Sequence, residues 1–377
     1  MPFRPDIPHE VPPLPPKIDL SRTAFAEELL PARVALAELK GYSELLPNPL
    51  ILLSPAILRE SIASSEIENI HTTLIDALQI DLFPSVGERR ESEKEVVRYR
   101  DAILHGFDLM GGLPLSTRLI QQTHAKLLPR QRGEYRQQQN RIANDATGEL
   151  VYTPPAAPSI PALMSNWEKF INTRDEAVDP LIRTALAHYQ FEAIHPFADG
   201  NGRCGRMMMV LQLVCAGVLK WPILYISGYI IRHRPEYYQL LRDVTAKKEW
   251  EPFIVFLLRG FCEQALETRS LLFDIMALFN SFKERVRTKH SRIYSHELIE
   301  ALFSFPVTTP AHLGRKLHVH YTTASRYLQQ LSGAGFLKDR TSGRHHLYLN
   351  SALLDLLQQS RPARPTGPLA ETIPDAK

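Results

Sequence analysis

Apolar residues recur at helical spacing along most of the chain, so the sequence predicts a mainly α fold. Two of the predicted helices begin at clear start signals, Ser54-Pro55 and Asp179-Pro180, in which a capping residue precedes a first-turn proline. The stretch Met207–Val218 is apolar at nearly every position and should be buried on most sides. The predicted helices cover residues 20–46, 54–70, 71–110, 116–128, 166–172, 179–194, 207–218 and 251–272.

The helical spacing is interrupted in two places. Between Arg141 and Pro155, two short extended runs flank the turn-rich cluster Asn144–Gly148, a pattern typical of a β-hairpin. Near the C-terminus, three short helices are followed by two extended runs around the Ser342-Gly343 turn. That order predicts a winged helix-turn-helix in which residues 321–331 form the recognition helix.

These patterns divide the chain into five predicted parts. Residues 1–16 contain seven prolines, which exclude a helix and predict an extended arm. A surface-draped or exposed arm is the simpler interpretation, and a partner-recognition segment is the alternative. The parts are the Pro-rich arm (1–16), an N-terminal helical region (17–110) that contains the helix at 54–70, a central domain (111–265), the winged-helix domain (282–350) and a disordered tail (360–377).

Composition places the chain among ordinary globular proteins. Hydrophobic residues make up 44% and charged residues 23% of its 377 positions. No run of about 18 uncharged apolar residues occurs, so we expect no membrane span. The N-terminus has no apolar core of the signal-peptide type, and the three cysteines follow no metal-binding spacing. These features lead us to expect a cytoplasmic protein.

Charge is spread unevenly. The net charge is only +3, yet residues 282–350 carry eleven Lys and Arg against four Asp and Glu. A basic winged helix is typical of DNA binding, and a module that docks a protein or supports dimerisation is the alternative. Charge alone does not decide between them. The candidate DNA contacts are Thr322, Thr323 and Arg326 on the recognition helix and Arg344 on the wing.

The densest chemistry lies between His195 and Arg206. These twelve residues hold one imidazole, one carboxylate, one carboxamide, three glycines and two guanidiniums. Pro196 and the Gly-Asn-Gly run break the helical spacing, so the segment should be a loop that enters a helix N-terminus, where backbone N–H groups and the helix dipole favour an anion. Asp199 suits Mg²⁺, and His195 can act as a general base. The segment therefore predicts metal-assisted attack on a nucleotide phosphate.

This segment resembles the signature of the Fic (Fido) family, His-Pro-Phe-x-(Asp/Glu)-Gly-Asn-(Gly/Lys)-Arg-x-x-Arg, at all nine constrained positions. The resemblance implies a Fic-type helical bundle that transfers AMP from ATP to a Ser, Thr or Tyr hydroxyl of a target protein, and of the protein itself, with release of pyrophosphate. His195 would deprotonate the hydroxyl, and Asp199 would hold Mg²⁺ or Mn²⁺. ATP would lie along Asp199, Gly200, Asn201, Gly202, Arg203, Cys204, Gly205 and Arg206, with the last arginine on the γ-phosphate.

A second motif, Ser64-x-x-x-Glu68-Asn69, resembles the inhibitory helix of Fic proteins. The resemblance implies that Glu68 pairs with Arg206, so that ATP can bind only in an unproductive pose. A solvent-exposed glutamate is the simpler alternative when the motif is taken alone. The same carboxylate could also position water for removal of AMP from a target.

Two further assignments follow from the resemblance. Tyr238 would contact the adenosine, with a core or rim tyrosine as the alternative. The hairpin would be a flap over the active site, in which Val151, Tyr152 and Thr153 pair with the target as an added strand. A plain surface hairpin is the alternative, and a homodimer is open.

A different class of function remains possible at this stage. The chain could be a DNA-binding transcriptional regulator that uses the winged helix and keeps the Fic body as a sensor. The complete catalytic set argues against a purely structural body.

Overall fold

The computed structural model describes residues 3–44, 46, 49–82, 91–144, 147–173, 177–342 and 345–359. Helices dominate these residues, which confirms the mainly α prediction. The predicted disordered tail at 360–377 lies outside the described residues. None of the helices described is both long and apolar enough to cross a membrane.

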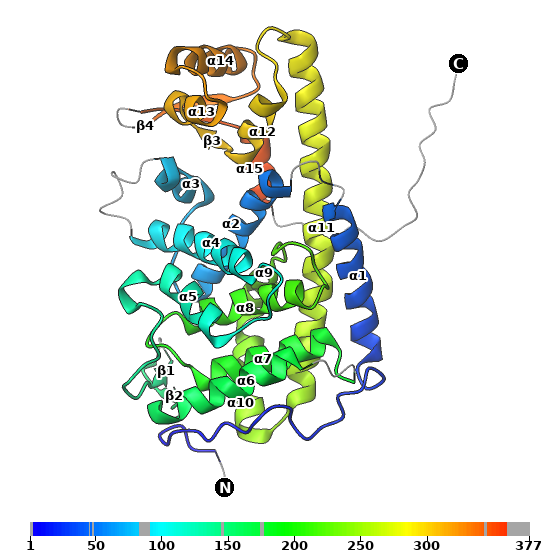
Figure 1. Cartoon of the computed structure of the whole chain (residues 1–377), viewed down its shortest axis with the longest axis vertical. Helices are drawn as coiled ribbons and strands as arrows, with labels where there is room; N and C mark the ends of the chain where they lie inside the picture. The colour runs from blue at the N-terminus through cyan, green and yellow to red at the C-terminus, as the bar shows by residue number, and fades with distance from the viewer. Residues whose placement is uncertain are drawn as a thin grey trace.

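The body of the molecule is a bundle of helices around two buried ones, α7 and α8, which pack against each other (Figure 1). Thirteen of the fifteen residues of α7 and twelve of the fifteen of α8 are buried, so both helices are held on nearly all sides. The body comprises α1 (Ala26–Glu44), α2 (Pro49–Ile67), α3 (Leu74–Leu82), α4 (Glu91–Met110), α5 (Thr117–Leu127), α6 (Ile160–Asn172), α7 (Pro180–Ile194), α8 (Asn201–Cys215), α9 (Ile226–Arg232) and α10 (Arg234–Lys247).

Helix α11 (Trp250–Lys289) runs the full height of the molecule, with α1 along its side (Figure 1). The sequence analysis ended this helix at Leu272 and left residues 266–281 between two domains. The helix instead continues without a break, because buried apolar residues keep helical spacing beyond that point. These residues are Ile275, Phe279, Phe282 and Val286.

Helix α2 differs from its prediction at both ends. It begins at Pro49, so a proline does stand in its first turn, but five residues before the start that we predicted. The predicted start at Ser54-Pro55 is therefore wrong, and Pro55 lies inside the helix. It ends at Ile67, and Asn69 then adopts a φ of 60°, as residues just past a helix C-terminus often do. Glu68 therefore follows the helix rather than lying within it.

The predicted hairpin and the predicted winged-helix order are both present. Strands β1 (Ile142–Ala143) and β2 (Leu150–Tyr152) pair in antiparallel fashion. The C-terminal elements are α12 (His296–Ser304), β3 (Val307–Thr308), α13 (Pro310–Leu317), α14 (Tyr321–Gly333), β4 (Lys338–Ser342), β5 (His345–Leu349) and α15 (Ser351–Gln358). Their sheet has the order β3-β5-β4. Sequence analysis missed β3, which has two residues, and α15.

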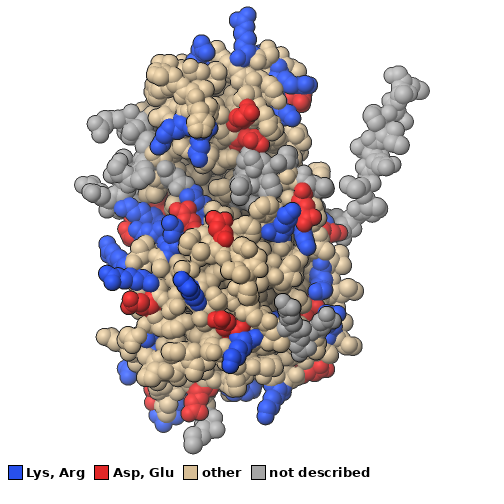
Figure 2. Space-filling view, in the orientation of Figure 1, with Lys and Arg blue, Asp and Glu red and all other residues tan. Residues whose placement is uncertain are grey.

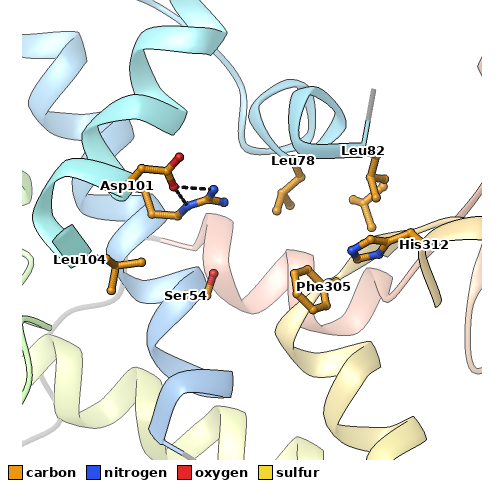
Figure 3. A pocket seen from close by; sticks show the side chains of 9 residues that line it. Ser54, Leu78, Leu82, Asp101, Leu104, Phe305 and His312 are labelled. Atoms are coloured by element: carbon orange, nitrogen blue, oxygen red, sulfur yellow. Dashed lines mark hydrogen bonds and ion pairs between the residues drawn. The ribbon is translucent and has the colours of Figure 1, made fainter. Parts of the chain in front are cut away.

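The C-terminal elements rest on the N-terminal helices of the body. Helices α12 and α15 pack on α2, and β3 packs on α3. A cavity of about 350 Å³ remains at this junction (Figure 3). Figure 3 shows it between residues of α2, α3 and α4 on one side and of the C-terminal elements on the other: Ser54, Leu78, Leu82, Arg100, Asp101, Leu104, Phe305, Val307 and His312.

Basic and acidic side chains are interspersed over the face of the molecule seen in Figure 2. The basic excess of residues 282–350 does not form one large single-sign area among the described atoms of that face. Clustered charge is the electrostatic footprint expected of DNA binding, so this face adds no support for it.

Leu36 and Leu30 provide a matched test of the α1 packing. Leu36 is fully buried, whereas Leu30 on the same helix is 66% exposed. We expect Leu36→Ala to lower the free energy of unfolding by about 2–5 kcal/mol, since it leaves a cavity in the core. Leu30→Ala should change it by less than about 0.5 kcal/mol. Urea denaturation followed by circular dichroism measures both, and equal effects would contradict the packing described.

Candidate functional site

His195 stands at the C-terminus of the buried helix α7. Asp179 caps the start of this helix by accepting a hydrogen bond from the Leu181 N–H at 3.0 Å. At the other end the His195 N–H donates to the Phe191 carbonyl at 3.0 Å, and His195 has φ 51° and ψ 59°. This left-handed conformation is uncommon for a residue with a side chain and turns the chain sharply out of the helix.

The loop after His195 is held by its own amide side chain. Asn201 accepts from the Phe197 N–H at 2.8 Å and donates to the Phe197 carbonyl at 2.9 Å. Gly200 starts α8 with φ 78°, and an added Cβ there would lie 2.8 Å from Leu128. The sequence analysis gave Asn201 to the phosphates; the structure uses its amide to hold the loop, which leaves the backbone at this position as the group available to an anion.

The N-terminus of α8 carries no side-chain cap, so its first N–H groups are those that an anion could accept from. Asp199 lies beside it with a side chain that is 64% exposed, and its Oδ1 accepts from the Gly200 N–H at 2.6 Å. Arg203 is buried and donates to Glu95 of α4 at 2.6 Å, while its other terminal nitrogen lies 3.4 Å from Asp199. Arg203, one of the predicted ATP residues, is thus fixed by a carboxylate that the sequence did not indicate.

Arg206 is almost entirely buried and is held by the end of α2. Its Nε donates to the Ser64 hydroxyl at 2.8 Å, and Nη2 donates to the Ser64 carbonyl at 2.8 Å and to the Glu68 carboxylate at 2.7 Å. The contact between Glu68 and Arg206 that the sequence analysis expected is therefore present. It joins residues that lie 138 positions apart.

Glu68 and Arg206 each stabilise the charged form of the other. Burial acts to raise the pKa of Glu68, but the charge and hydrogen bond of Arg206 outweigh it and lower the pKa. Burial likewise opposes the charged form of Arg206, and Glu68 overcomes it and raises that pKa. Gly202 makes room for the pair, since an added Cβ would clash with the Glu68 carboxylate and lie 3.0 Å from Arg206 Nη1.

The His195 imidazole is neutral at physiological pH. Burial is the main cause, and the positive charge of Arg136 adds to it, so the pKa of His195 falls to about 4. The negative charges of Glu68 and Asp199 act in the opposite direction and do not compensate. A neutral imidazole can accept a proton, as a general base requires.

Arg136 is a site residue that the sequence analysis did not identify. It is buried, and its guanidinium donates to three backbone carbonyls: that of His195 at 2.9 Å, that of Gln138 at 3.0 Å and that of Pro155 at 2.5 Å. Its own N–H donates to the Pro196 carbonyl at 2.9 Å. Arg136 thereby connects the hairpin with the His195 loop. No signal in the sequence pointed to this role, because the acceptors are backbone carbonyls.

Cys204 and Gly205 face the interior. Cys204 is buried, and burial raises the pKa of its thiol, so it is not a reactive thiolate. Gly205 lies against Glu192 of α7, in a space that a Cβ would fill. Burial raises the pKa of Glu192 to about 8, which keeps this carboxyl protonated near pH 7. In the structure both predicted ATP residues serve the packing of α8 on α7.

Tyr238 on α10 lies next to the end of α2. Its ring is half-buried, and the Arg234 guanidinium lies 5.9 Å from the ring centre. The same arginine donates to the Asn69 side chain at 3.2 Å. Burial is the main cause that raises the pKa of Tyr238, and the negative charge of Glu68 adds to it. Its contact with adenosine stays a prediction.

The predicted flap residues lie at the C-terminal end of α7. Val151 and Tyr152 belong to β2, and Thr153 follows it and is buried. The Tyr152 hydroxyl donates to the Ala193 carbonyl at 2.7 Å, two residues before His195. This contact fixes the hairpin against the end of α7.

The candidate DNA contacts differ in their exposure to solvent. Thr322 and Arg326 are exposed on α14, and Thr323 is partly buried. Arg344 lies outside the described residues. Their role stays a prediction.

Family comparisons agree with this geometry. Residues 114–213 match the Fic/DOC family and residues 26–108 match its N-terminal region. Residues 278–353 match the C-terminal domain described as protein adenylyltransferase SoFic-like. The chain belongs to the Fic/DOC family.

Individual proteins give the same assignment. The protein adenylyltransferase Fic of Aedes aegypti is 31% identical over 143 residues, which are 37% of this chain and 26% of that protein. The chain thus matches about a quarter of that relative's length. A Fic family protein from Desulfovibrio desulfuricans has a TM-score of 0.54 and 21% identity over 90% of this chain and 98% of its own. A Fic domain containing signaling protein from Bacteroides thetaiotaomicron has a TM-score of 0.52 and 18% identity over 64% and 94%. These two show the fold.

Replacement of Arg136 tests its effect on the imidazole. We expect Arg136→Gln to raise the pKa of His195 above its value of about 4, because the variant removes a positive charge and loosens the burial. Histidine NMR titration measures the shift, with the His195 signal assigned by its loss in His195→Ala. The control is Arg130→Gln, which replaces an exposed arginine nearby. An unchanged His195 titration in Arg136→Gln would contradict the charge effect.

Proposed function

We propose that this protein is an adenylyltransferase that moves AMP from ATP to a hydroxyl of a protein, and that Glu68 inhibits it. The observation that carries the proposal is the convergence of three groups: a neutral imidazole at His195, an uncapped helix N-terminus, and a buried guanidinium at Arg206. The first suits a hydroxyl acceptor, and the other two suit a polyphosphate. Relatives named protein adenylyltransferase support this reaction, and they do not favour the DNA-binding regulator.

The reaction balances with the groups present. The acceptor oxygen forms a bond to the α-phosphorus as the bond from that phosphorus to the bridging oxygen breaks. The hydroxyl proton passes to the His195 imidazole, and pyrophosphate takes the electron pair of the broken bond. The N–H groups at the start of α8 stabilise charge on the phosphate oxygens as it develops.

The region around Asp199 fits a divalent cation shared with phosphates. Its carboxylate is mostly exposed, and Oδ1 is already used by the Gly200 N–H. No group of three or more ligating residues occurs among the described residues, so a cation would need ligands from the nucleotide. Mg²⁺ commonly binds through one carboxylate plus substrate phosphates, and there it would neutralise phosphate charge. Mn²⁺ would fit the same oxygen donors.

Glu68 supports inhibition because it occupies the arginine that the γ-phosphate needs. The carboxylate and a phosphate both accept from the same guanidinium N–H groups. Ser64 accepts from Nε and Nη2 of the same guanidinium, which keeps Arg206 directed toward the end of α2 and Glu68. ATP that binds under these conditions loses its γ-phosphate contact and the alignment that depends on it.

Removal of Glu68 should raise activity. We expect Glu68→Gly to increase incorporation of α-labelled ATP into the protein itself by about 5–150-fold, because a coupling of that size is typical between competing sites. Radiolabel on the denatured, gel-separated chain measures it. Glu66→Gly, on the same turn, is the matched control and should behave as the unchanged protein.

Two further results bear on this proposal. Label on Glu68→Gly should disappear in Glu68→Gly/His195→Ala, since the base is gone. Absence of label from ATP, UTP and CTP in every variant would contradict the proposed reaction.

The lowered pKa of His195 predicts the pH dependence. A histidine whose pKa is about 4 stays neutral and able to accept a proton at all higher pH values. We therefore expect kcat/KM of Glu68→Gly to stay flat from pH 8 to about pH 5, because kcat/KM reports the free enzyme. Loss of Glu68 keeps the pKa low, since that carboxylate raises it. An acid limb centred near the ordinary value of about 6.5, with folding intact by circular dichroism, would contradict this.

A further inference from the structure

The N-terminal arm is fixed to the body at its C-terminal half. Val11 and Leu14 are buried, and the Leu14 N–H donates to the Asn166 side chain of α6 at 2.9 Å. The Pro12 carbonyl accepts from Gln190 of α7 at 2.7 Å. Figure 1 shows the arm running along the edge of the body beneath these helices, with its free end near the hairpin.

The first part of the arm, residues 3–9, covers the flap. The His9 N–H donates to the Thr153 carbonyl at 2.9 Å, and the Thr153 hydroxyl donates to the Pro5 carbonyl at 2.6 Å. The ring centres of Phe3 and His9 lie 6.4 and 5.7 Å from that of Tyr152. Thr153 is only 2% exposed. Tyr152 and Thr153, two of the three residues expected to dock a target, are therefore in contact with the chain's own N-terminus.

The composition of the arm bears on what it can do there. Residues 1–20 contain no Ser, Thr or Tyr, and the first hydroxyl is that of Ser21. A segment that lies on the flap and has no hydroxyl gives the reaction no acceptor. It can occupy the docking surface without becoming a product.

We propose that residues 3–9 are an intramolecular occupant of the flap, which a target segment must displace before it can be modified. The proposal rests on the proposed function, since docking on the flap is part of that function. The contacts also define the chemistry of the partner. The surface takes a segment that presents an aromatic ring to Tyr152, a backbone N–H to the Thr153 carbonyl and a carbonyl to the Thr153 hydroxyl, and residues 4–7 of the arm do so through a turn in which the Ile7 N–H donates to the Arg4 carbonyl.

The contacts of the arm allow residues 3–9 to leave the flap while the rest of the arm stays attached. Arg4, Asp6 and Ile7 are exposed, and the ion pair of Arg4 with Asp6 lies within the arm itself. Two hydrogen bonds and the ring contacts hold residues 3–9, while the buried residues at 11 and 14 keep the arm attached. The free end can therefore leave the flap and return. The arm would control access of the acceptor protein to the flap, whereas Glu68 would control the binding of ATP.

A peptide taken from the arm tests this contact directly. The full-length variant Phe3→Ala/His9→Pro loses both rings that contact Tyr152 and the N–H donor of residue 9. The probe is a fluorescein-labelled peptide of residues 2–10. We expect it to bind this variant about 10- to 100-fold tighter than the unchanged protein, the size expected for two ring contacts and one hydrogen bond. Ile7→Ala is the control for the arm and should bind the peptide as the unchanged protein does.

A second measurement connects the arm with the reaction. In a Glu68→Gly background, Phe3→Ala/His9→Pro should increase self-labelling by α-labelled ATP, and added unlabelled peptide should reverse the increase. Equal peptide binding by the variant and the unchanged protein, absence of binding to both, or labelling that the peptide does not change would overturn the proposal. Peptide binding to the variant with no label in any Glu68→Gly protein would support the arm contact and overturn the reaction instead. Circular dichroism checks that each variant is folded.

Discussion

The charge of Arg206 is the constraint on which the site depends. A guanidinium buried this deeply needs acceptors, because an unpaired buried charge is very unfavourable. Ser64 and Glu68 provide them at present. A phosphate group would satisfy the same need with the same geometry. Glu68 and a phosphate cannot both accept from the Arg206 guanidinium, because both are anions and both need the same N–H groups. The site therefore switches when one anion replaces the other, without a large movement.

Two buried arginines use their charges in opposite ways. The charge of Arg206 is paired with the carboxylate of Glu68. Arg136 is bound by carbonyls, and no ion pair to it occurs among the residues described. Its charge is thus available to repel a proton from His195. In the proposed reaction, Arg206 would receive a phosphate and Arg136 would keep His195 able to accept a proton.

The sequence predicted what local rules determine. Helical spacing, the hairpin turn and the motif at residues 195–206 gave the main elements and brought His195, Asp199 and Arg206 into one site. The contact of Glu68 with Arg206 came from family resemblance, since spacing says nothing about partners 138 positions apart. Arg136 was missed because carbonyl acceptors leave no mark in a sequence. The start of α2 and the unbroken α11 were missed because tertiary packing overrode the local signals of Pro55 and of the apparent domain boundary.

Helix α2 has two neighbourhoods. Near Ser54 it borders the cavity at the C-terminal elements, and at Ser64 it holds Arg206 (Figure 3). Ten residues of helix separate them, about 15 Å of a stiff rod. A rigid-body shift of this helix would therefore move the cavity wall at Ser54 and the Ser64 hydroxyl that holds Arg206 together.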